Sequence, residues 1–166
     1  MVLTPTGVRF MGRHFPCVIG KGGIKTDKRE GDGATPTGQH RIVGMLYRPD
    51  RISAPQPWAR PIGTMDLWSD HSGDVDYNTL VRRPYAKSHE VLRRADPLYD
   101  LVLTTDYNWP KATPDKGSAI FIHQWRRPGF GTEGCIAFRR DHLRWIAEHI
   151  QLGTVVTVPE GLAAQP

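Results

Sequence analysis

Apolar residues in this chain form short runs separated by turn-forming residues, not long amphipathic stretches. Seventeen Gly and fourteen Pro residues punctuate these runs, whose length and β-branched content favour strands. The pattern predicts strands at Gly7–Phe10, Phe15–Gly20, His40–Leu46, Tyr99–Thr104, Ala119–His123, Cys135–Phe138 and Thr154–Val158. We therefore expect a mainly β protein.

Two segments are expected to be helical. Between Asp141 and Gln151, apolar residues recur at the i, i+3, i+4, i+7 spacing of an amphipathic helix. A shorter helix is predicted near Ser88–Arg94, because Ser88 is a favourable N-cap residue. The stretch Tyr47–Tyr85 has no clear periodicity and is long for a loop, so we expect short elements or functional residues within it.

The length of the chain predicts a single domain. A chain of 166 residues has about the size of one domain, so residues 1–166 are expected to form one β-rich domain with mixed sheets or a sandwich. No apolar run approaches the roughly 20 residues that a membrane-spanning helix needs. The start of the chain, MVLTPTGVRF, lacks the basic and apolar regions of a secretory signal.

The net charge is +5 and the isoelectric point about 9.5. Basic residues are scattered in pairs and are not clustered with aromatic residues, so we expect no nucleic-acid partner. A basic surface also suits an anionic polymer such as peptidoglycan. A non-catalytic module that binds such a polymer therefore stays open as one interpretation.

The two cysteines, Cys17 and Cys135, are too few for a disulfide framework or a cysteine-rich zinc site. Cys135 follows a glycine-rich stretch and begins a predicted strand, whereas His123 ends the preceding one. A nearby imidazole that takes the thiol proton makes a cysteine nucleophilic. Glycines before the cysteine allow a tight turn whose N–H groups can hold an oxyanion. The alternative interpretation is a buried cysteine beside a structural histidine.

Two motifs resemble those of the L,D-transpeptidase family, the YkuD-type catalytic domain. His123, a spacer and the sequence Thr132-Glu133-Gly134-Cys135 are similar to the family's His and Ser/Thr-x-Gly-Cys pattern. Upstream, residues 31–38 resemble its Gly-x-x-Thr-Pro-x-Gly turn. The resemblance implies a mostly β fold with one or two short helices, action on peptidoglycan stem peptides in the cell envelope or periplasm, and no metal or organic cofactor.

The resemblance also implies roles for individual residues. Cys135 would attack an L,D peptide bond of one stem peptide, and an amine of a second one would then take the thioester to give a 3,3 or 1,3 cross-link. His123 would act as base and then acid, and the carbonyl of Gln124 would orient its ring. The N–H groups of Cys135 and Gly134 would hold the oxyanion. Carbapenems would acylate Cys135. If water took the thioester instead, the protein would be an L,D-carboxypeptidase or endopeptidase.

This sequence departs from the family pattern at two residues and in the length of the spacer between the histidine and the cysteine. Many members have His where this chain has Glu133, and Arg where it has Ala137. The spacer between His123 and Cys135 is also short. A shorter loop leaves less wall around the substrate, so we expect a choice of acceptor that differs from that of the usual cross-linking members.

Residues close to the two motifs in the sequence are candidates for substrate binding. An arginine after His123 could pair with a stem-peptide carboxylate, and a tyrosine after a strand could donate a hydrogen bond, although a solvated loop or a plain turn explains both patterns as well. The candidates are Trp125, Arg126, Arg127, Tyr107, Thr132, Glu133 and Arg139.

Two other enzyme classes fit the sequence poorly. A cysteine phosphatase needs an arginine six residues after its cysteine, where this chain has Asp141. A zinc hydrolase could use His71, Asp74 and Asp76, but the His-Glu-x-x-His spacing is absent. We therefore expect no metal site.

Overall fold

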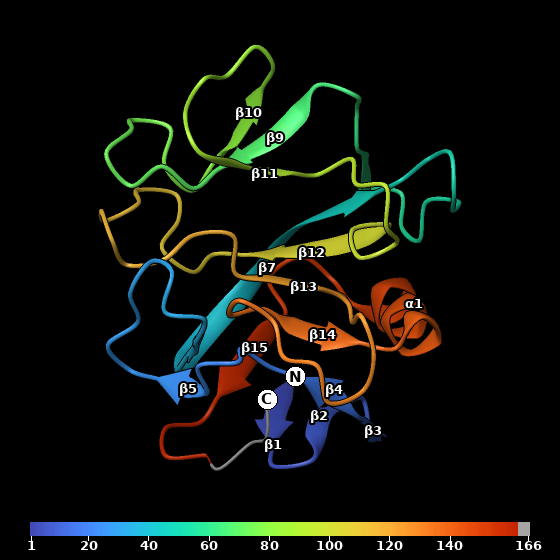
Figure 1. Ribbon diagram of the computed structural model, residues 1–166. Helices are drawn as coiled ribbons and strands as arrows, with labels where there is room; N and C mark the ends of the chain where they lie inside the picture. The colour runs from blue at the N-terminus through green and yellow to red at the C-terminus, as the bar shows by residue number, and fades with distance from the viewer. Residues whose placement is uncertain (163–166) are drawn as a thin grey trace.

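A twisted sheet of ten strands forms the body of the protein in the computed structural model, which describes residues 1–162 (Figure 1). The predicted mainly β fold is confirmed, and the sheet mixes parallel and antiparallel pairs. The strands follow in the order β3 (Arg13–Phe15), β2 (Gly7–Phe10), β1 (Val2–Thr4), β15 (Val155–Val158), β7 (Gly38–Tyr47), β12 (Leu101–Thr105), β13 (Phe121–Gln124), β14 (Ile136–Phe138) and β4 (Cys17–Val18), with β8 (Arg60–Pro61) beside β7.

The long strand β7 joins the two halves of the sheet. It pairs antiparallel with β15 over its first half and with β12 over its second half. Beyond β12 lies β13, which pairs antiparallel with β12 but parallel with β14. Residues 125–135 connect these two parallel strands, and the connection carries the glycine-rich loop before Cys135.

Helix α1 (Arg140–His149) covers one face of the sheet and confirms the more periodic of the two predicted helices. It packs Leu143, Ile146 and Ala147 into a core with alternate residues of the strands, such as Ile122 and Phe138. These apolar positions share one side of the helix because three or four residues separate them. The strongest apolar periodicity in the sequence therefore fixes which face of the sheet is closed by a helix.

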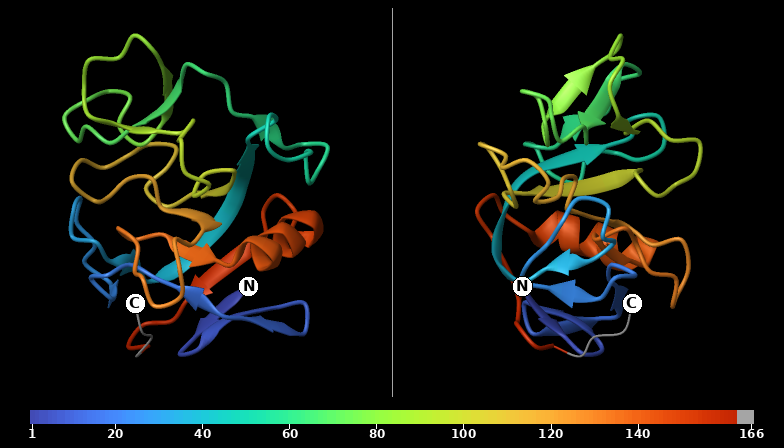
Figure 2. Two further views of the ribbon diagram at one scale, coloured as in Figure 1. Left: turned by 45° about the vertical axis from the view of Figure 1, so that its right-hand side comes forward. Right: turned by 60° about the vertical axis from the view of Figure 1, so that its left-hand side comes forward.

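A small sheet covers part of the opposite face (Figure 2). Its strands are β9 (Asp66–Ser69), β10 (Leu80–Arg82) and β11 (His89–Val91), in the order β10-β9-β11. The Trp68 ring of β9 packs edge-on against Phe121 of β13, with 5.0 Å between ring centroids. The expectation of short elements within Tyr47–Tyr85 is confirmed.

The helix expected at Ser88–Arg94 is wrong, because His89–Val91 is strand β11. Glu90 lies opposite Trp68 in the antiparallel pairing with β9. This pairing satisfies backbone groups that a single isolated helical turn would leave open at its ends. Pairing with β9 has therefore outweighed the weak helical preference that Ser88 gives this segment.

Two predicted strands have different limits for local backbone reasons. The predicted strand Phe15–Gly20 is split between β3 and β4 at Pro16, whose ring removes the N–H that a ladder needs. The strand predicted to begin at Ala119 begins at Phe121 instead, since Ala119 has a left-handed φ of +51°. The remaining pair, β5 (Ile24–Lys25) and β6 (Thr35–Pro36), is too short for the sequence pattern to reveal.

The helix–sheet core generates a first prediction. Leu143 is 1% exposed, so Leu143→Ala should lower the free energy of unfolding by about 2–5 kcal/mol through lost burial and a residual cavity. Denaturant unfolding followed by circular dichroism measures the change. Leu152→Ala, at a side chain that is 53% exposed, is the control and should cost less than about 0.5 kcal/mol.

Candidate active site

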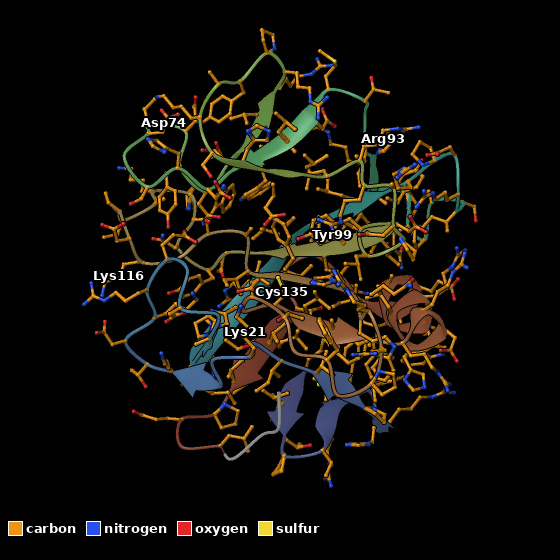
Figure 3. The ribbon with its side chains drawn as sticks, viewed as in Figure 1. Lys21, Asp74, Arg93, Tyr99, Lys116 and Cys135 are labelled. Atoms are coloured by element: carbon orange, nitrogen blue, oxygen red, sulfur yellow. The ribbon has the colours of Figure 1, made fainter. Side chains whose placement is uncertain are left out.

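The parallel pairing of β13 and β14 brings the predicted histidine and cysteine together. Ile122 lies opposite Ile136 in this register. Since side chains alternate between faces along a strand, Cys135 falls on the same face as Phe121 and His123. The backbone N–H of Phe121 donates to Cys135 Sγ at 3.3 Å. Cys135 lies near the centre of the molecule, with Tyr99 above it in the view of Figure 3.

Gly134 shapes the turn that presents the cysteine. Its φ is +133°, and a Cβ here would lie 2.7 Å from the carbonyl oxygen of Ala34, so another residue would force the backbone to move. Thr132 closes the turn: its hydroxyl donates to the carbonyl oxygen of Cys135 at 2.6 Å and accepts the Gly134 N–H at 3.2 Å. Hydrogen bonds of the Thr132 hydroxyl thus fix the backbone turn that leads into Cys135.

Thr35 connects the two sequence motifs. Its hydroxyl donates to the carbonyl oxygen of Gly134 at 2.8 Å and accepts the N–H of Gly20 at 2.9 Å. The side chain is buried, and it belongs to β6, within the upstream motif at residues 31–38. The upstream motif therefore supports the loop that carries the cysteine.

His123 is buried, and within residues 1–162 only its Nδ1 has a hydrogen-bond partner. Its Nδ1 lies 2.7 Å from the carbonyl oxygen of Gln124, and a carbonyl can only accept, so Nδ1 carries the proton and Nε2 is left as the basic nitrogen. The Tyr99 ring packs against it edge-on at 5.2 Å. Burial lowers the pKa of His123 to about 4, although the Gln124 carbonyl opposes this shift.

Cys135 is a protonated thiol in the resting site. The residue is 7% exposed, and its Sγ donates to the carbonyl oxygen of Ala119 at 3.1 Å. Burial raises the pKa of the thiol to about 12, although the Phe121 N–H acts in the opposite direction. In the resting site, burial therefore favours the neutral forms of both the Cys135 thiol and the His123 imidazole.

A cleft of about 370 Å³ opens onto this pair. Three of the candidates for substrate binding, Arg126, Thr132 and Glu133, line it. The guanidinium of Arg126 lies 5.1 Å from the Phe130 ring centroid. Glu133 is exposed and forms an ion pair with Lys21 at 2.6 Å, so the lysine partly neutralises the charge of its carboxylate.

Four other candidates for substrate binding lie outside the lining of this cleft in the described part of the chain: Trp125, Arg127, Tyr107 and Arg139. The Tyr107 hydroxyl donates to the carbonyl oxygen of Lys116 within its own loop, at 2.5 Å. Arg139 forms a bidentate pair with Asp141 on the exterior. These two side chains are engaged in local structure.

The cleft also contains charged residues that the sequence analysis missed: Glu30, Asp70, Glu90 and Arg94. Burial raises the pKa of Glu90, and the nearby Asp70 carboxylate adds to this effect. Arg94 is bound to Asp96 by two hydrogen bonds of 2.9 and 2.7 Å. Glu90 and Arg94 fell within the segment predicted as a helix, so no sequence signal pointed to them as part of the site.

Cys17 lies away from the site. It is paired with Phe138 across β4 and β14 and packs against the core on the helix side of the sheet. Cys135 belongs to the apolar cluster on the opposite side. A disulfide needs Cα atoms within about 7 Å and Cβ vectors that face one another, so these two cysteines do not form one in this fold.

The family model of the L,D-transpeptidase catalytic domain, YkuD, matches residues 5–158. The chain belongs to this family. Searches of curated proteins and of solved structures found no match. In this L,D-transpeptidase-family domain, His123 of β13 and Cys135, directly before the adjacent strand β14, line one cleft.

Neither a metal site nor a membrane span is found in the described part of this family member. Within residues 1–162, no group of three or more His, Cys, Asp or Glu side chains is placed to hold a metal ion. In the same range, no helix combines the length and the apolar character needed to cross a bilayer.

Removal of the Thr35 hydroxyl should weaken the link between the two motifs. In Thr35→Val, the N–H of Gly20 and the carbonyl of Gly134 lose a buried partner, which should cost about 1–3 kcal/mol. Urea unfolding measures this cost. Thr37→Val is the matched control, because among the described residues the Thr37 hydroxyl donates only to the exposed Thr26 hydroxyl; an equal loss in both variants would contradict the assigned role of Thr35.

Burial of His123 predicts a pH-dependent stability. The unfolded chain binds a proton at this residue below pH 6.5, whereas the folded protein does so only below about 4. Stability should therefore fall as the pH decreases from 6.5 to 4, by up to about 3 kcal/mol from this group. Urea unfolding across this range should give a smaller slope for His123→Gln. Some slope should remain because burial also lowers the pKa of His40; identical slopes would contradict the prediction.

Proposed function

We propose that the protein is a cysteine L,D-transpeptidase that cross-links peptidoglycan stem peptides in the cell envelope. The observation that carries the proposal is that Cys135, directly before β14, and His123 of the adjacent strand β13 line one cleft. Membership of the family supplies the substrate class and the site of action. The proposal takes no metal or organic cofactor.

In the acylation step, Cys135 attacks the carbonyl carbon of an L,D peptide bond of the donor stem peptide. The thiol proton passes to Nε2 of His123 as the S–C bond forms, because a neutral thiol is a poor nucleophile. The carbonyl oxygen gains the negative charge. The bond to the terminal D-residue then breaks, its amine takes the proton from His123, and a thioester remains on Cys135.

In the second step, an amine of another stem peptide attacks the thioester carbonyl. Nε2 of His123 takes a proton from this amine, the C–S bond breaks, and the sulfur leaves with that proton. The product is a new amide, which is a 3,3 or 1,3 cross-link according to the donor. Water in place of the amine would make the enzyme an L,D-carboxypeptidase or endopeptidase, the alternative raised by Ala137 at the position where many members have Arg.

The oxyanion is assigned to the backbone N–H groups of Cys135 and Gly134. Two such donors stabilise developing charge strongly in a site that excludes water. The Gly134 N–H has a 3.2 Å hydrogen bond to the Thr132 hydroxyl, which is at the long limit for this kind of contact. An oxyanion is a better hydrogen-bond acceptor than a hydroxyl. The Gly134 N–H would therefore exchange the Thr132 hydroxyl for the oxyanion as its acceptor while negative charge develops.

Arg126 is assigned to a carboxylate of the stem peptide. It lines the cleft, and within residues 1–162 it forms no ion pair. Its guanidinium lies over Phe130, an arrangement that leaves its planar edge able to form two hydrogen bonds with a carboxylate.

Substitution of the nucleophile tests the proposal. Incubation with disaccharide-peptides of defined stem length, followed by mass spectrometry, should yield cross-linked dimers from the wild-type protein. Cys135→Ala should lower their formation by at least about three orders of magnitude. Cys17→Ala is the matched control and should retain activity, because Cys17 lies on the opposite side of the sheet.

The outcomes distinguish the candidate functions. Loss of the terminal D-residue without dimers would identify a hydrolase. Full activity in Cys135→Ala would contradict both enzymes, and binding to peptidoglycan without turnover in either protein would identify the non-catalytic module. A carbapenem should add its mass to the wild-type protein and to Cys17→Ala, but not to Cys135→Ala.

A further inference from the structure

Asn78 lies at a junction between the small sheet and the site. It is 3% exposed and has a left-handed φ of +59°. Its Oδ1 accepts from Trp68 Nε1 at 3.0 Å and from the backbone N–H of Ala119 at 2.9 Å. Its Nδ2 donates to the carbonyl oxygens of Tyr107 at 3.0 Å and Asn108 at 2.8 Å. The hydrogen-bonding capacity of the amide is completely used.

Ala119 connects this junction to the nucleophile. Its φ of +51° is uncommon for a residue with a Cβ, and such a conformation persists only where its surroundings hold it. On one side, the Ala119 N–H is held by Asn78. On the other side, its carbonyl oxygen accepts the thiol of Cys135 at 3.1 Å.

We propose that Asn78 is a positioning residue for Cys135: by holding Ala119 in its left-handed conformation, it fixes the carbonyl that sets the direction of the thiol. The inference rests on the proposed function for its effect on turnover, but not for its effect on the thiol. Without Asn78, Ala119 relaxes towards a negative φ and its carbonyl turns away from Sγ. The sulfur then loses its acceptor and its defined rotamer.

If Asn78 has this role, its loss should change the reactivity of the thiol and the rate of turnover in opposite directions. A hydrogen bond donated by the S–H group stabilises the protonated form, so its loss makes the thiolate more accessible and the thiol more reactive towards a small reagent. Turnover requires the sulfur at a defined place against the substrate carbonyl, and misplacement of about 1 Å costs up to about 100-fold. The thiol should therefore become more reactive while the enzyme becomes slower.

Asn78→Gly tests the inference in a Cys17→Ala background, where Cys135 is the remaining thiol. Glycine tolerates the left-handed φ, so the substitution removes the side chain without straining residue 78. Alkylation of Cys135 by iodoacetamide at pH 8 should be about three- to tenfold faster, the factor that one hydrogen bond supplies. The kcat for stem peptides should fall by about 10- to 100-fold, with KM within about twofold.

Asn108→Gly is the matched control. Asn108 also has a left-handed φ, of +50°, and its amide also ties a loop, through Thr113 and Gly117. Its side chain makes no hydrogen bond to Ala119 among the described residues, and glycine keeps the backbone carbonyl that accepts from Asn78, so this variant should lower the melting temperature and leave both alkylation and kcat unchanged. Equal effects of the two variants, or no effect of Asn78→Gly on alkylation, would overturn the inference.

A second measurement needs no substitution at Asn78. Methyl methanethiosulfonate converts the Cys135 thiol to a methyl disulfide and thus removes the S–H donor. In ¹⁵N-labelled protein, this modification should shift the side-chain amide signals of Asn78 and leave those of Asn108 in place. Unchanged Asn78 signals would overturn the inference even if Asn78→Gly fails to fold. If the protein shows no turnover but the thiol measurements give the expected result, the proposed function fails and the positioning role stands.

Discussion

The parallel register between β13 and β14 is the constraint on which the site depends. It sets Ile122 opposite Ile136, which sends these two side chains into the helix-side core and places His123 and Cys135 on the opposite face. A shift by one residue would exchange the two faces of either strand. The apolar packing under α1 therefore helps to hold the chemical pair in place.

Long-range hydrogen bonds then fix the loop that carries Cys135, which the strand register positions only approximately. The Thr35 hydroxyl reaches the carbonyl of Gly134 from 99 positions away in the chain, and the turn at Gly134 has no room for a side chain. In the sequence, residues 31–38 and residues 132–135 were related only by their resemblance to motifs of one family. In the structure, the first segment holds the second in place. The upstream motif therefore supports the nucleophile loop through Thr35 and also lines the cleft through Gly31.

The sequence predicted the parts of this protein that depend on local pattern. The apolar spacing around Leu143 gave the helix, and the strand-like runs that end at His123 and begin at Cys135 gave the central strands. The failures have a common cause in tertiary contact. Pairing with β9 made a strand of His89–Val91, and the left-handed φ of Ala119 shortened another. The acidic residues of the cleft come from separate segments whose meeting no local pattern encodes.

Burial gives the resting site a chemical character that the motif alone does not convey. It raises the pKa of the Cys135 thiol and lowers that of His123, so transfer of the proton from one to the other is unfavourable until negative charge can move onto a substrate carbonyl. Thiolates are the form that oxidants attack. In the proposed mechanism the thiolate forms only as the substrate reacts, so the resting thiol, whose proton the Ala119 carbonyl accepts, would be a poor target for oxidants.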